Sequence, residues 1–390
     1  MITKIDFPAA PRKAAIVTFG TRLTLYTAGI RKVGLIYLRE YIMNVLGRTQ
    51  VDYVSKKSGK EAELDYYRDI RDTDLNDYDE LWIFHSPFNP FGGVFKESAL
   101  ITFDKMVDYK GDVIYYYGDP KMGPWDFGKF LEYKDRQVGW SNCGDIPCDN
   151  PERPKYHIPY ERCHEFTDKI FSKMMCAFAG KDMNMLHEKV CTARSRLTYN
   201  KWHPDLRWFF CDLHGYEAIN EDLDDKLKDG DFSDKEYDLI YFGNNRHSNR
   251  LRVIETLYGN TDELHKLFLG YDPQLANTTV MRYVDHDKMF DMMRRSFATV
   301  VCGDIAHNDN ICTPRYYEAM LCDCVAFIYD KFDSKRAYIK DEVLRNFCYV
   351  STHDELVEKI NKIKNDEAFY RDIIHRQRED TLSQLQHLKY

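Results

Sequence analysis

Residues 237–258 read YDLIYFGNNRHSNRLRVIETLY, and this stretch decides the fold class. The apolar run Tyr237–Phe242 predicts a buried strand, and a helical pattern follows at Asn249–Tyr258. Gly243 permits a tight turn between them, because glycine reaches backbone angles that other residues avoid. A strand that passes through a glycine turn into a helix is the repeating unit of α/β domains.

The same alternation of strand and helix continues through both halves of the chain. Further strands are predicted at Ala14–Phe19, Val51–Ser55, Leu81–His85, Val113–Tyr117, Lys266–Leu269, Thr299–Cys302, Val325–Tyr329 and Phe347–Val350. The region Pro120–Asn200 is less regular and holds one amphipathic helical pattern, near His164–Phe178. This alternation predicts an α/β protein with two doubly wound, Rossmann-like domains whose strands end at a shared cleft.

The 390 residues are enough for two domains, each with its own core. We expect an N-terminal domain over residues 1–216, an acidic linker over 217–236 and a C-terminal domain over 237–365. Ten acidic residues and three lysines in Glu217–Asp238 indicate a solvated linker. The last helix, within residues 366–390, is expected to pack back on the N-terminal domain.

Composition narrows the class of protein further. No apolar run approaches the roughly 20 residues that span a bilayer, and the first residues lack the apolar core of a signal peptide, so we expect a cytoplasmic protein with no membrane contact. The net charge of −8 gives no overall attraction to nucleic acid, so any contact with DNA needs a local basic face. A monomer is expected.

Cysteine usage favours buried, reduced thiols over a disulfide framework. The 11 cysteines are dispersed, and Cys211, Cys302 and Cys348 lie in apolar runs. A second group, Cys143, Cys148, His157, Cys163 and His164, has a spacing that matches no strong zinc signature, so a zinc site there stays open beside ordinary loop thiols.

The turn after Tyr237–Phe242 has the composition of an anion site. It carries Arg246, and Ser248 is a candidate N-cap that places Arg250 in the first helical turn. Two guanidinium groups beside a helix N-terminus can each fork onto phosphate oxygens. Surface ion pairs are the alternative, but the loop lies where α/β sheets bind their ligands.

A second loop, after Thr299–Cys302, leads to the same sheet edge. Thr313 at the N-cap and Pro314 at the first helical position start a helix, which puts Arg315 in its first turn. Glu318 lies three residues further on the same helix face, where it could bind ribose hydroxyls or simply pair with Arg315.

Three stretches resemble one known family. They are Tyr237–Arg250 (YDLIYFGNNRHSNR), Val301–Asp333 (VCGDIAHNDNICTPRYYEAMLCDCVAFIYDKFD) and the residues NPFGG and IYYYGD within Asn89–Asp119. All three are similar to the DNA β-glucosyltransferases of T-even phages. The similarity covers most of the chain and is patchy between about residues 120 and 235.

The resemblance implies a GT-B fold and an inverting transfer of a sugar from a UDP-sugar donor. The acceptor would be the hydroxymethyl group of a modified pyrimidine, 5-hydroxymethylcytosine, in double-stranded phage DNA, and the enzyme would act in the host cytoplasm if phage-encoded. Asp119 falls on the catalytic base of the family. The donor-binding positions are Gly20, Gly243, Asn244, Arg246, Arg250, Asp304, Arg315 and Glu318.

Two departures from the family pattern concern the sugar. Gly34 replaces an acidic residue at the start of the first long helix, and a donor-contacting glutamate falls near His214. Glucose is therefore the default sugar, with arabinose as a competitor. Asp304 and Asp309 could also help to hold Mg²⁺ or Mn²⁺ at the phosphates.

Basic residues interleaved with aromatic ones are candidates for DNA contact, or they complete an irregular surface and its core. They are Lys121, Trp125, Lys129, Arg136, Arg194 and Arg196. Two other functions remain open from the residues alone. One is a glycosyltransferase that acts on a small molecule or a glycan, and the other is a non-catalytic nucleotide-sugar-binding protein.

Overall fold

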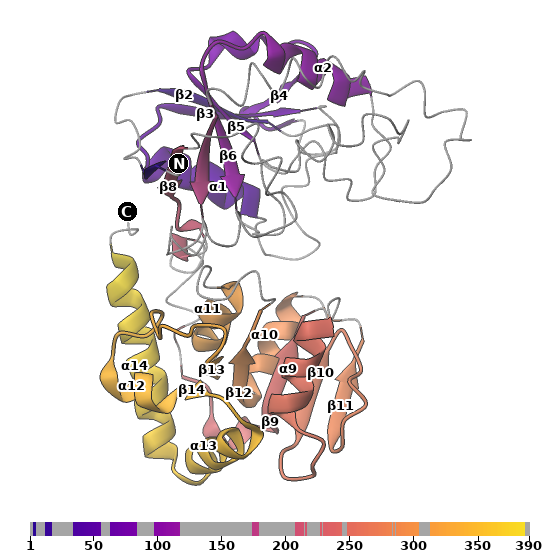
Figure 1. Cartoon of the computed structure of the whole chain (residues 1–390), viewed down its shortest axis with the longest axis vertical. Helices are drawn as coiled ribbons and strands as arrows, with labels where there is room; N and C mark the ends of the chain where they lie inside the picture. The colour runs from indigo at the N-terminus through magenta and orange to yellow at the C-terminus, as the bar shows by residue number, and fades with distance from the viewer. Residues whose placement is uncertain are drawn as a thin grey trace, which may run out of the picture. The chain divides into compact units, whose positions relative to one another are not determined.

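The protein is described here from a computed structural model, which places two compact units (Figure 1). The described residues are 3–4, 12–17, 34–55, 63–83, 97–117, 174–178, 207–213, 215–216, 227, 229–243, 248–282, 284, 286–303 and 313–386. Those up to Leu213 form the first unit, and those from Gly215 onward form the second.

The first unit contains an eight-stranded sheet in which every pair of neighbours is parallel. Its spatial order is β1-β8-β7-β6-β5-β2-β3-β4. The strands are β1 (Thr3–Lys4), β2 (Lys13–Val17), β3 (Gln50–Ser55), β4 (Tyr67–Asp69), β5 (Glu80–Ile83), β6 (Asp112–Tyr117), β7 (Met174–Phe178) and β8 (Arg207–Phe210). Helix α1 (Gly34–Asn44) connects β2 to β3, and α2 (Glu97–Val107) lies between β5 and β6.

The central strands of this sheet are apolar on both faces. Four consecutive residues of β2, Ala14 to Val17, are fully buried, as are Leu81, Trp82 and Ile83 of β5. Continuous apolar runs of this kind are typical of parallel sheets that are covered on both sides. The direction in which strands are added reverses between β2 and β5, and such a switch point is where open α/β sheets bind ligands.

The second unit contains a six-stranded sheet, again parallel throughout. Its order is β11-β10-β9-β12-β13-β14, the 3-2-1-4-5-6 arrangement of dinucleotide-binding domains. The strands are β9 (Tyr237–Phe242), β10 (Lys266–Leu269), β11 (Thr278–Met281), β12 (Ser296–Val301), β13 (Val325–Tyr329) and β14 (Tyr349–Val350). The switch point of this sheet lies between β9 and β12.

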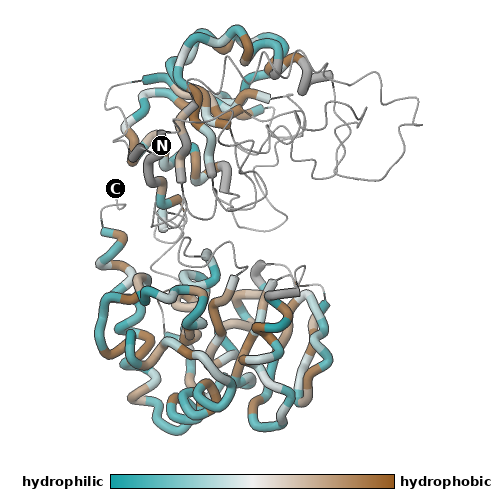
Figure 2. The backbone as a smooth tube through the Cα atoms, in the orientation of Figure 1, coloured by the Kyte–Doolittle hydropathy of each residue, from teal (hydrophilic) through white to brown (hydrophobic). Residues whose placement is uncertain are grey.

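Helices surround this second sheet. They are α9 (Ser248–Tyr258), α10 (His286–Arg294), α11 (Pro314–Leu321), α12 (Glu342–Phe347), α13 (His353–Asn365) and α14 (Glu367–Leu385). Hydrophobic residues concentrate in the strands and hydrophilic residues are frequent on the helices, as Figure 2 shows. Of the described helices, none combines the length and the hydropathy that a bilayer crossing requires. The prediction of two doubly wound α/β domains is confirmed.

Two local predictions were wrong, and strands β1, β4, β8 and β11 were not predicted. Met174–Phe178 is strand β7 rather than the end of a helix, because a short apolar run does not reveal its own periodicity. Strand β11 was missed because its four residues are only partly buried and form no continuous apolar run. Phe347 ends helix α12 rather than starting a strand, because Asp341 caps that helix by accepting a hydrogen bond from the Leu344 amide.

Helix α14 contacts β13, α11, α12 and α13, all within the second unit. Tyr370, Ile373 and Ile374 on this helix are fully buried. The predicted domain bounds, and the packing of residues 366–390 on the N-terminal domain, stay predictions.

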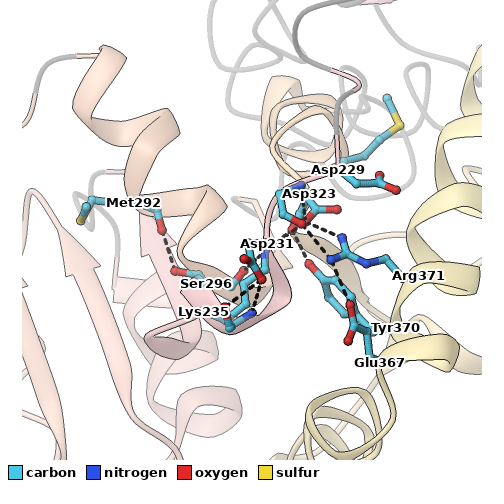
Figure 3. Close-up of polar contacts among 12 residues, drawn as sticks. Asp229, Asp231, Lys235, Met292, Ser296, Asp323, Glu367, Tyr370 and Arg371 are labelled. Carbon is cyan, nitrogen blue, oxygen red and sulfur yellow. Dashed lines mark hydrogen bonds and ion pairs between the residues drawn. The ribbon is translucent and has the colours of Figure 1, made fainter.

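The described part of the acidic segment, residue 227 and residues 229–236, contacts the rest of the second unit (Figure 3), while Asp229, Asp231 and Asp234 are exposed. Arg371 on α14 donates to the carbonyl oxygen of Gly230 over 2.8 Å. The ring of Phe232 lies edge-on to those of Phe297 and Tyr370, with centroids 5.3 and 5.4 Å away. Through these contacts, residues whose composition predicted a linker pack against the second unit.

Five of the described cysteines are buried thiols that form no disulfide: Cys211, Cys302, Cys322, Cys324 and Cys348. The prediction of buried thiols is therefore confirmed for Cys211, Cys302 and Cys348. The cysteine and histidine residues between 143 and 164 lie outside the described residues.

Candidate functional site

The candidate site lies at the carboxyl edge of the second sheet, at its switch point. Ala298 pairs with Leu239 and Thr299 with Ile240, so β9 and β12 end at the same level. Gly243 follows β9 directly, and Cys302 follows β12. In open α/β sheets, the edge beyond the carboxyl ends of two such strands is where ligands bind.

Gly243 and Arg315 approach each other at this point. Gly243 has a φ of +133°, which side chains other than hydrogen rarely tolerate. A Cβ atom there would lie 2.2 Å from Nη2 of Arg315 and 2.9 Å from its Cζ. The sequence predicted that the glycine permits a tight turn, and the structure shows that it also makes room for the arginine.

Arg315 is a half-buried cation in the first turn of α11. Its Nη1 donates to the carbonyl oxygen of Cys302 over 3.2 Å, and its Cζ lies 5.8 Å from the ring centroid of Tyr241 and 5.9 Å from that of Phe242. Across the described ranges, no carboxylate forms an ion pair with it. A guanidinium has five N–H donors, so one backbone bond leaves most of them to bind an anion.

Arg250 reaches the same neighbourhood from the first turn of α9. Burial raises the pKa of Tyr241, while the charges of Arg315 and Arg250 and a hydrogen bond between Arg250 and the tyrosine hydroxyl oppose the increase. Burial also raises the pKa of the Cys302 thiol, against the same two charges. Two arginines that are distant in sequence therefore act on the same pair of side chains.

Helix α11 begins as predicted, with Thr313 as N-cap at φ −77°, ψ 152° and Pro314 as first residue. The Thr313 side chain makes no capping hydrogen bond, and its buried hydroxyl has no partner within the described part. Glu318 lies on α11 and is half-buried. The positive end of the helix adds to the charge of Arg315 at this edge.

Helix α9 starts at Ser248 itself, one residue earlier than a Ser248 N-cap implies. Such a shift is within the ordinary variation of helix ends, and Arg250 remains in the first turn.

Sequence reasoning missed a third loop beside the site. Gly270, with a φ of +90°, follows β10, and a Cβ there would lie 3.8 Å from the carbonyl oxygen of Gly243. The next residue, Tyr271, lies edge-on to Tyr241 at 6.4 Å and to Phe268 at 5.9 Å. The signal was available, because a glycine ends the apolar run Lys266–Leu269 just as Gly243 ends Tyr237–Phe242.

Several predicted site residues lie outside the described residues. They are Asp119, Gly20, Asn244, Arg246, Asp304 and Asp309 at the donor and catalytic positions, and Lys121, Trp125, Lys129, Arg136, Arg194 and Arg196 at the proposed DNA contacts. Asp119 comes two residues after β6 ends, and β6 pairs with β5 beside the switch point of the first sheet. In the part of the chain that the structure describes, no group of three or more His, Cys, Asp and Glu side chains suits a metal ion.

Comparison with known proteins gives one family match and one curated relative. Residues 246–387 match a family described as glycosyl transferase-like. The chain is 22% identical over 372 residues to the DNA beta-glucosyltransferase of Enterobacteria phage T4, which covers 93% of this chain and 92% of the relative. The predicted resemblance is confirmed.

Solved structures agree with this match. T4 phage β-glucosyltransferase in complex with its UDP-glucose substrate is 20% identical, covers 96% of both chains and superposes with a TM-score of 0.66. The same phage enzyme in complex with UDP and Mn²⁺ is 21% identical, with 96% of both chains covered and a TM-score of 0.67. An alpha-glucosyltransferase in complex with UDP is 10% identical over 95% of both chains, with a TM-score of 0.53. The chain has the GT-B fold.

Proposed function

We propose that this chain is a UDP-sugar-dependent DNA glycosyltransferase. It transfers a sugar, with inversion, to the hydroxymethyl group of 5-hydroxymethylcytosine in phage DNA. The observation that carries the proposal is the placement of Arg315 over Gly243 at the switch point, with Arg250 beside it and no carboxylate paired to Arg315 in the described ranges. Similarity to a phage DNA glucosyltransferase over 93% of the chain supports the substrates.

The donor site binds the diphosphate through its cations. Arg315, Arg250 and Arg246 donate to phosphate oxygens, and Gly243, Asn244 and Gly20 are the further proposed donor contacts. Guanidinium groups suit this task because their planar fork matches two phosphate oxygens at once. Glu318, on the same helix as Arg315, accepts hydrogen bonds from the ribose hydroxyls, a role that suits a carboxylate.

The reaction is a single displacement at the anomeric carbon. Asp119 accepts the proton of the hydroxymethyl group while its oxygen bonds to the anomeric carbon. The bond from that carbon to the diphosphate oxygen breaks, and UDP leaves with the negative charge. Because that charge develops in the transition state, the arginines stabilise the transition state more than the bound donor. Asp304 and Asp309 are candidate ligands for Mg²⁺ or Mn²⁺ at the phosphates.

Glucose is the proposed sugar, with arabinose as the alternative. Helix α1 begins at Gly34, where the resembling family carries an acidic residue, and its first turn holds no acidic side chain. A missing carboxylate removes an acceptor for sugar hydroxyls. The mass of the adduct on DNA will therefore show which sugar is transferred.

On the acceptor side, Lys121, Trp125, Lys129, Arg136, Arg194 and Arg196 are the proposed contacts with double-stranded DNA. Lysine and arginine would neutralise phosphates, and the aromatic ring would support a base that leaves the stack. The protein would act as a monomer, in the cytoplasm of the host cell.

Mass spectrometry of nucleosides tests this function. DNA that contains 5-hydroxymethylcytosine is incubated with the chain and either UDP-glucose or UDP-arabinose, with unmodified cytosine DNA as control. We expect a hexose or pentose adduct on 5-hydroxymethylcytosine alone. Sugar transfer to a small molecule or glycan with no adduct on DNA would overturn the choice of acceptor.

The Asp119→Asn variant separates an enzyme from a binding protein. Loss of the general base should lower the transfer rate by about 10²- to 10⁴-fold while UDP binding persists. UDP binding without consumption of any UDP-sugar by the unmodified chain would favour a non-catalytic nucleotide-sugar-binding protein.

A further inference from the structure

The ladder between β9 and β12 stops short of the ends of both strands. Its last register pair is Thr299 with Ile240, whereas β9 continues to Phe242 and β12 to Val301. Each strand keeps pairing with its outer neighbour, β10 or β13, up to that end. Within the described strands, the last two residues of each therefore lack a register partner along this seam, which is the switch point of the sheet.

The side chain of Tyr258 reaches the seam at the point where pairing stops. Tyr258 is the last residue of α9, and it is fully buried. Its hydroxyl donates to the carbonyl oxygen of Ile240 over 3.0 Å and accepts a longer, weaker bond from the amide of Val300 over 3.5 Å. The phenol oxygen is therefore bonded to the backbone of both strands beside their last register pair.

Packing holds the Tyr258 hydroxyl in this place. The ring lies edge-on to that of Tyr241 at 5.9 Å and is tilted against that of Phe268 at 5.1 Å, which leaves it little freedom. Burial raises the pKa of Tyr258, so the hydroxyl keeps its proton and can donate it to the carbonyl.

The Ile240 carbonyl accepts bonds from two side chains. Besides the Tyr258 hydroxyl, the hydroxyl of Thr299 donates to it over 2.8 Å. A carbonyl oxygen has two lone pairs, so side-chain donors compete with the neighbouring strand for them. We therefore expect the two hydroxyl groups to weaken the direct bond between β9 and β12 and to end the ladder there.

Arg315 lies just beyond this interrupted seam. Its Nη1 donates to the carbonyl oxygen of Cys302, and its Nη2 would lie 2.2 Å from a Cβ on Gly243. Cys302 and Gly243 each come three residues after the last register pair on their own strand. A ladder that continued would hold the strand ends about 4.8 Å apart. Unpaired residues instead leave the ends free to take the separation that the guanidinium requires.

We propose that Tyr258 is a positioning residue whose hydroxyl ends the ladder between β9 and β12 and sets the spacing of the strand ends that hold Arg315. It thereby fixes the guanidinium in the place where the diphosphate of UDP binds. This inference rests on the proposed function, because it takes that diphosphate to be the ligand of Arg315. Tyr258 touches no substrate and acts through the arginine.

Calorimetric titration of the full chain with UDP tests this role. Tyr258→Phe removes the hydroxyl and keeps the ring, so the ladder can extend and the strand ends can move together. We expect UDP to bind about 5- to 10-fold more weakly, somewhat less than for the complete loss of a hydrogen bond to a charged group. All titrations are made well below the unfolding midpoint of the least stable variant.

Tyr109→Phe is the matched control. Tyr109 lies in the first unit, is buried, and donates from its hydroxyl to the carbonyl oxygen of Tyr78 over 3.1 Å. Each variant loses a buried bond from a phenol to a backbone carbonyl, so both should shift the denaturation midpoint by similar amounts. Tyr109→Phe should keep its UDP affinity within about twofold, because it is independent of the seam.

A double-mutant cycle shows whether Tyr258 acts through Arg315. In an Arg315→Ala background, Tyr258→Phe should cause no further loss of UDP affinity, because the side chain that the seam positions is already gone. In steady-state assays, Tyr258→Phe should raise KM for the UDP-sugar and leave KM for DNA unchanged.

The outcomes separate this inference from the proposed function. If the unmodified chain binds no UDP, both fail. If it binds UDP and Tyr258→Phe binds equally well, only the role of Tyr258 is overturned. The same holds if Tyr109→Phe weakens UDP binding as much as Tyr258→Phe does, because the effect would then follow from lost stability. An undiminished effect of Tyr258→Phe in the Arg315→Ala background would likewise overturn it.

Discussion

The two edges of the second sheet use positive charge in opposite ways. At the carboxyl edge, Arg315 bonds to a backbone carbonyl and pairs with no carboxylate in the described ranges. At the amino edge, Lys235 and Arg371 form ion pairs with the carboxylate of Asp323 (Figure 3), and Arg378 is a third partner of that carboxylate. The cations at the amino edge are neutralised by the protein itself, whereas Arg315 keeps its charge for a ligand.

The amino edge is a closed network. The Lys235 amine is fully buried and lies 3.5 Å from Oδ2 of Asp323, and it also donates to the carbonyl oxygens of Ser296 and Asp323. Burial lowers the pKa of Lys235, and the charge of Asp323 opposes that change. Tyr370 adds a hydrogen bond from its hydroxyl to the Asp323 carbonyl. A buried ammonium is stable only with such partners, because isolated charges are costly to remove from water.

The first unit repeats this arrangement at its own amino edge. Arg48 donates to Glu80 over 2.8 Å, and both side chains are fully buried. Glu80 is the first residue of β5 and also accepts a bond from the Trp82 indole over 3.0 Å. In both units, charge at the amino edge is paired and holds the fold, which suggests that unpaired charge at the carboxyl edge is kept for function.

Lys235→Met is the substitution with the largest expected effect on the stability of the amino edge. Removing the buried amine leaves Asp323 with less compensation, so we expect the free energy of unfolding to fall by about 3–5 kcal/mol. Chemical denaturation measures the loss, and the UDP affinity of the folded protein should not change. As a control, Lys288→Met removes an exposed cation that pairs with Asp291 at 3.0 Å, and should cost less than about 1 kcal/mol. Equal losses of unfolding free energy for the two variants would show that the buried ion pair contributes no more to stability than the exposed one.

Arg315→Ala is the reciprocal change at the carboxyl edge. Because Arg315 pairs with no described carboxylate, its loss should alter the free energy of unfolding by less than about 1 kcal/mol. UDP binding should weaken by about 1.5–3 kcal/mol, the value of a hydrogen bond to a charged group. Calorimetry and denaturation on the same samples check both numbers. A large loss of stability with unchanged UDP binding would contradict the comparison.

Gly243→Ala tests whether the backbone makes room for Arg315. The new Cβ would lie 2.2 Å from the guanidinium, so the arginine must move, and we expect UDP to bind about tenfold more weakly, or 1.4 kcal/mol. Gly47→Ala is the matched control, since Gly47 has a φ of +68° and, within the described residues, its Cβ would meet no atom within 4 Å. Both variants should lose about 1–2 kcal/mol of stability from the unfavourable φ. Only Gly243→Ala should lose UDP affinity, and equal UDP affinities would refute the close approach.

The smallest expected effect concerns Asp229, at the exposed rim of the amino edge. Burial raises the pKa of its carboxyl group, but hydrogen bonds from His375 and Arg378 outweigh burial and leave the pKa below its usual value. A lowered folded pKa adds stability above the unfolded value of about 3.9, and that stability is lost as pH falls through the folded pKa. Asp229→Asn should therefore cost less than about 1 kcal/mol at neutral pH, since the pair is partly solvated. Denaturation curves of the two proteins should converge below pH 4; a constant difference would exclude this linkage.

Much of this protein follows from the sequence alone. Local sequence predicts the strand Tyr237–Phe242, the turn at the glycine after it and the start of α11 at Thr313-Pro314. It can do so because strand pattern, turn chemistry and helix capping each act over a few residues. Those local rules place Gly243, Arg250 and Arg315 just after strands or in first helical turns. They thereby predict an anion site at a sheet edge.

Only the tertiary structure decided which of these side chains meet. The pairing of β9 with β12 brings Gly243 close to Arg315, and the packing of α9 and β10 surrounds the Tyr241 ring, whose centroid lies 5.8 Å from Cζ of Arg315. The end of the acidic segment is likewise fixed by α14, which lies far along the chain. No local pattern could show these contacts, because they depend on strand order and side-chain packing between distant segments, and these arise only when the sheet is assembled.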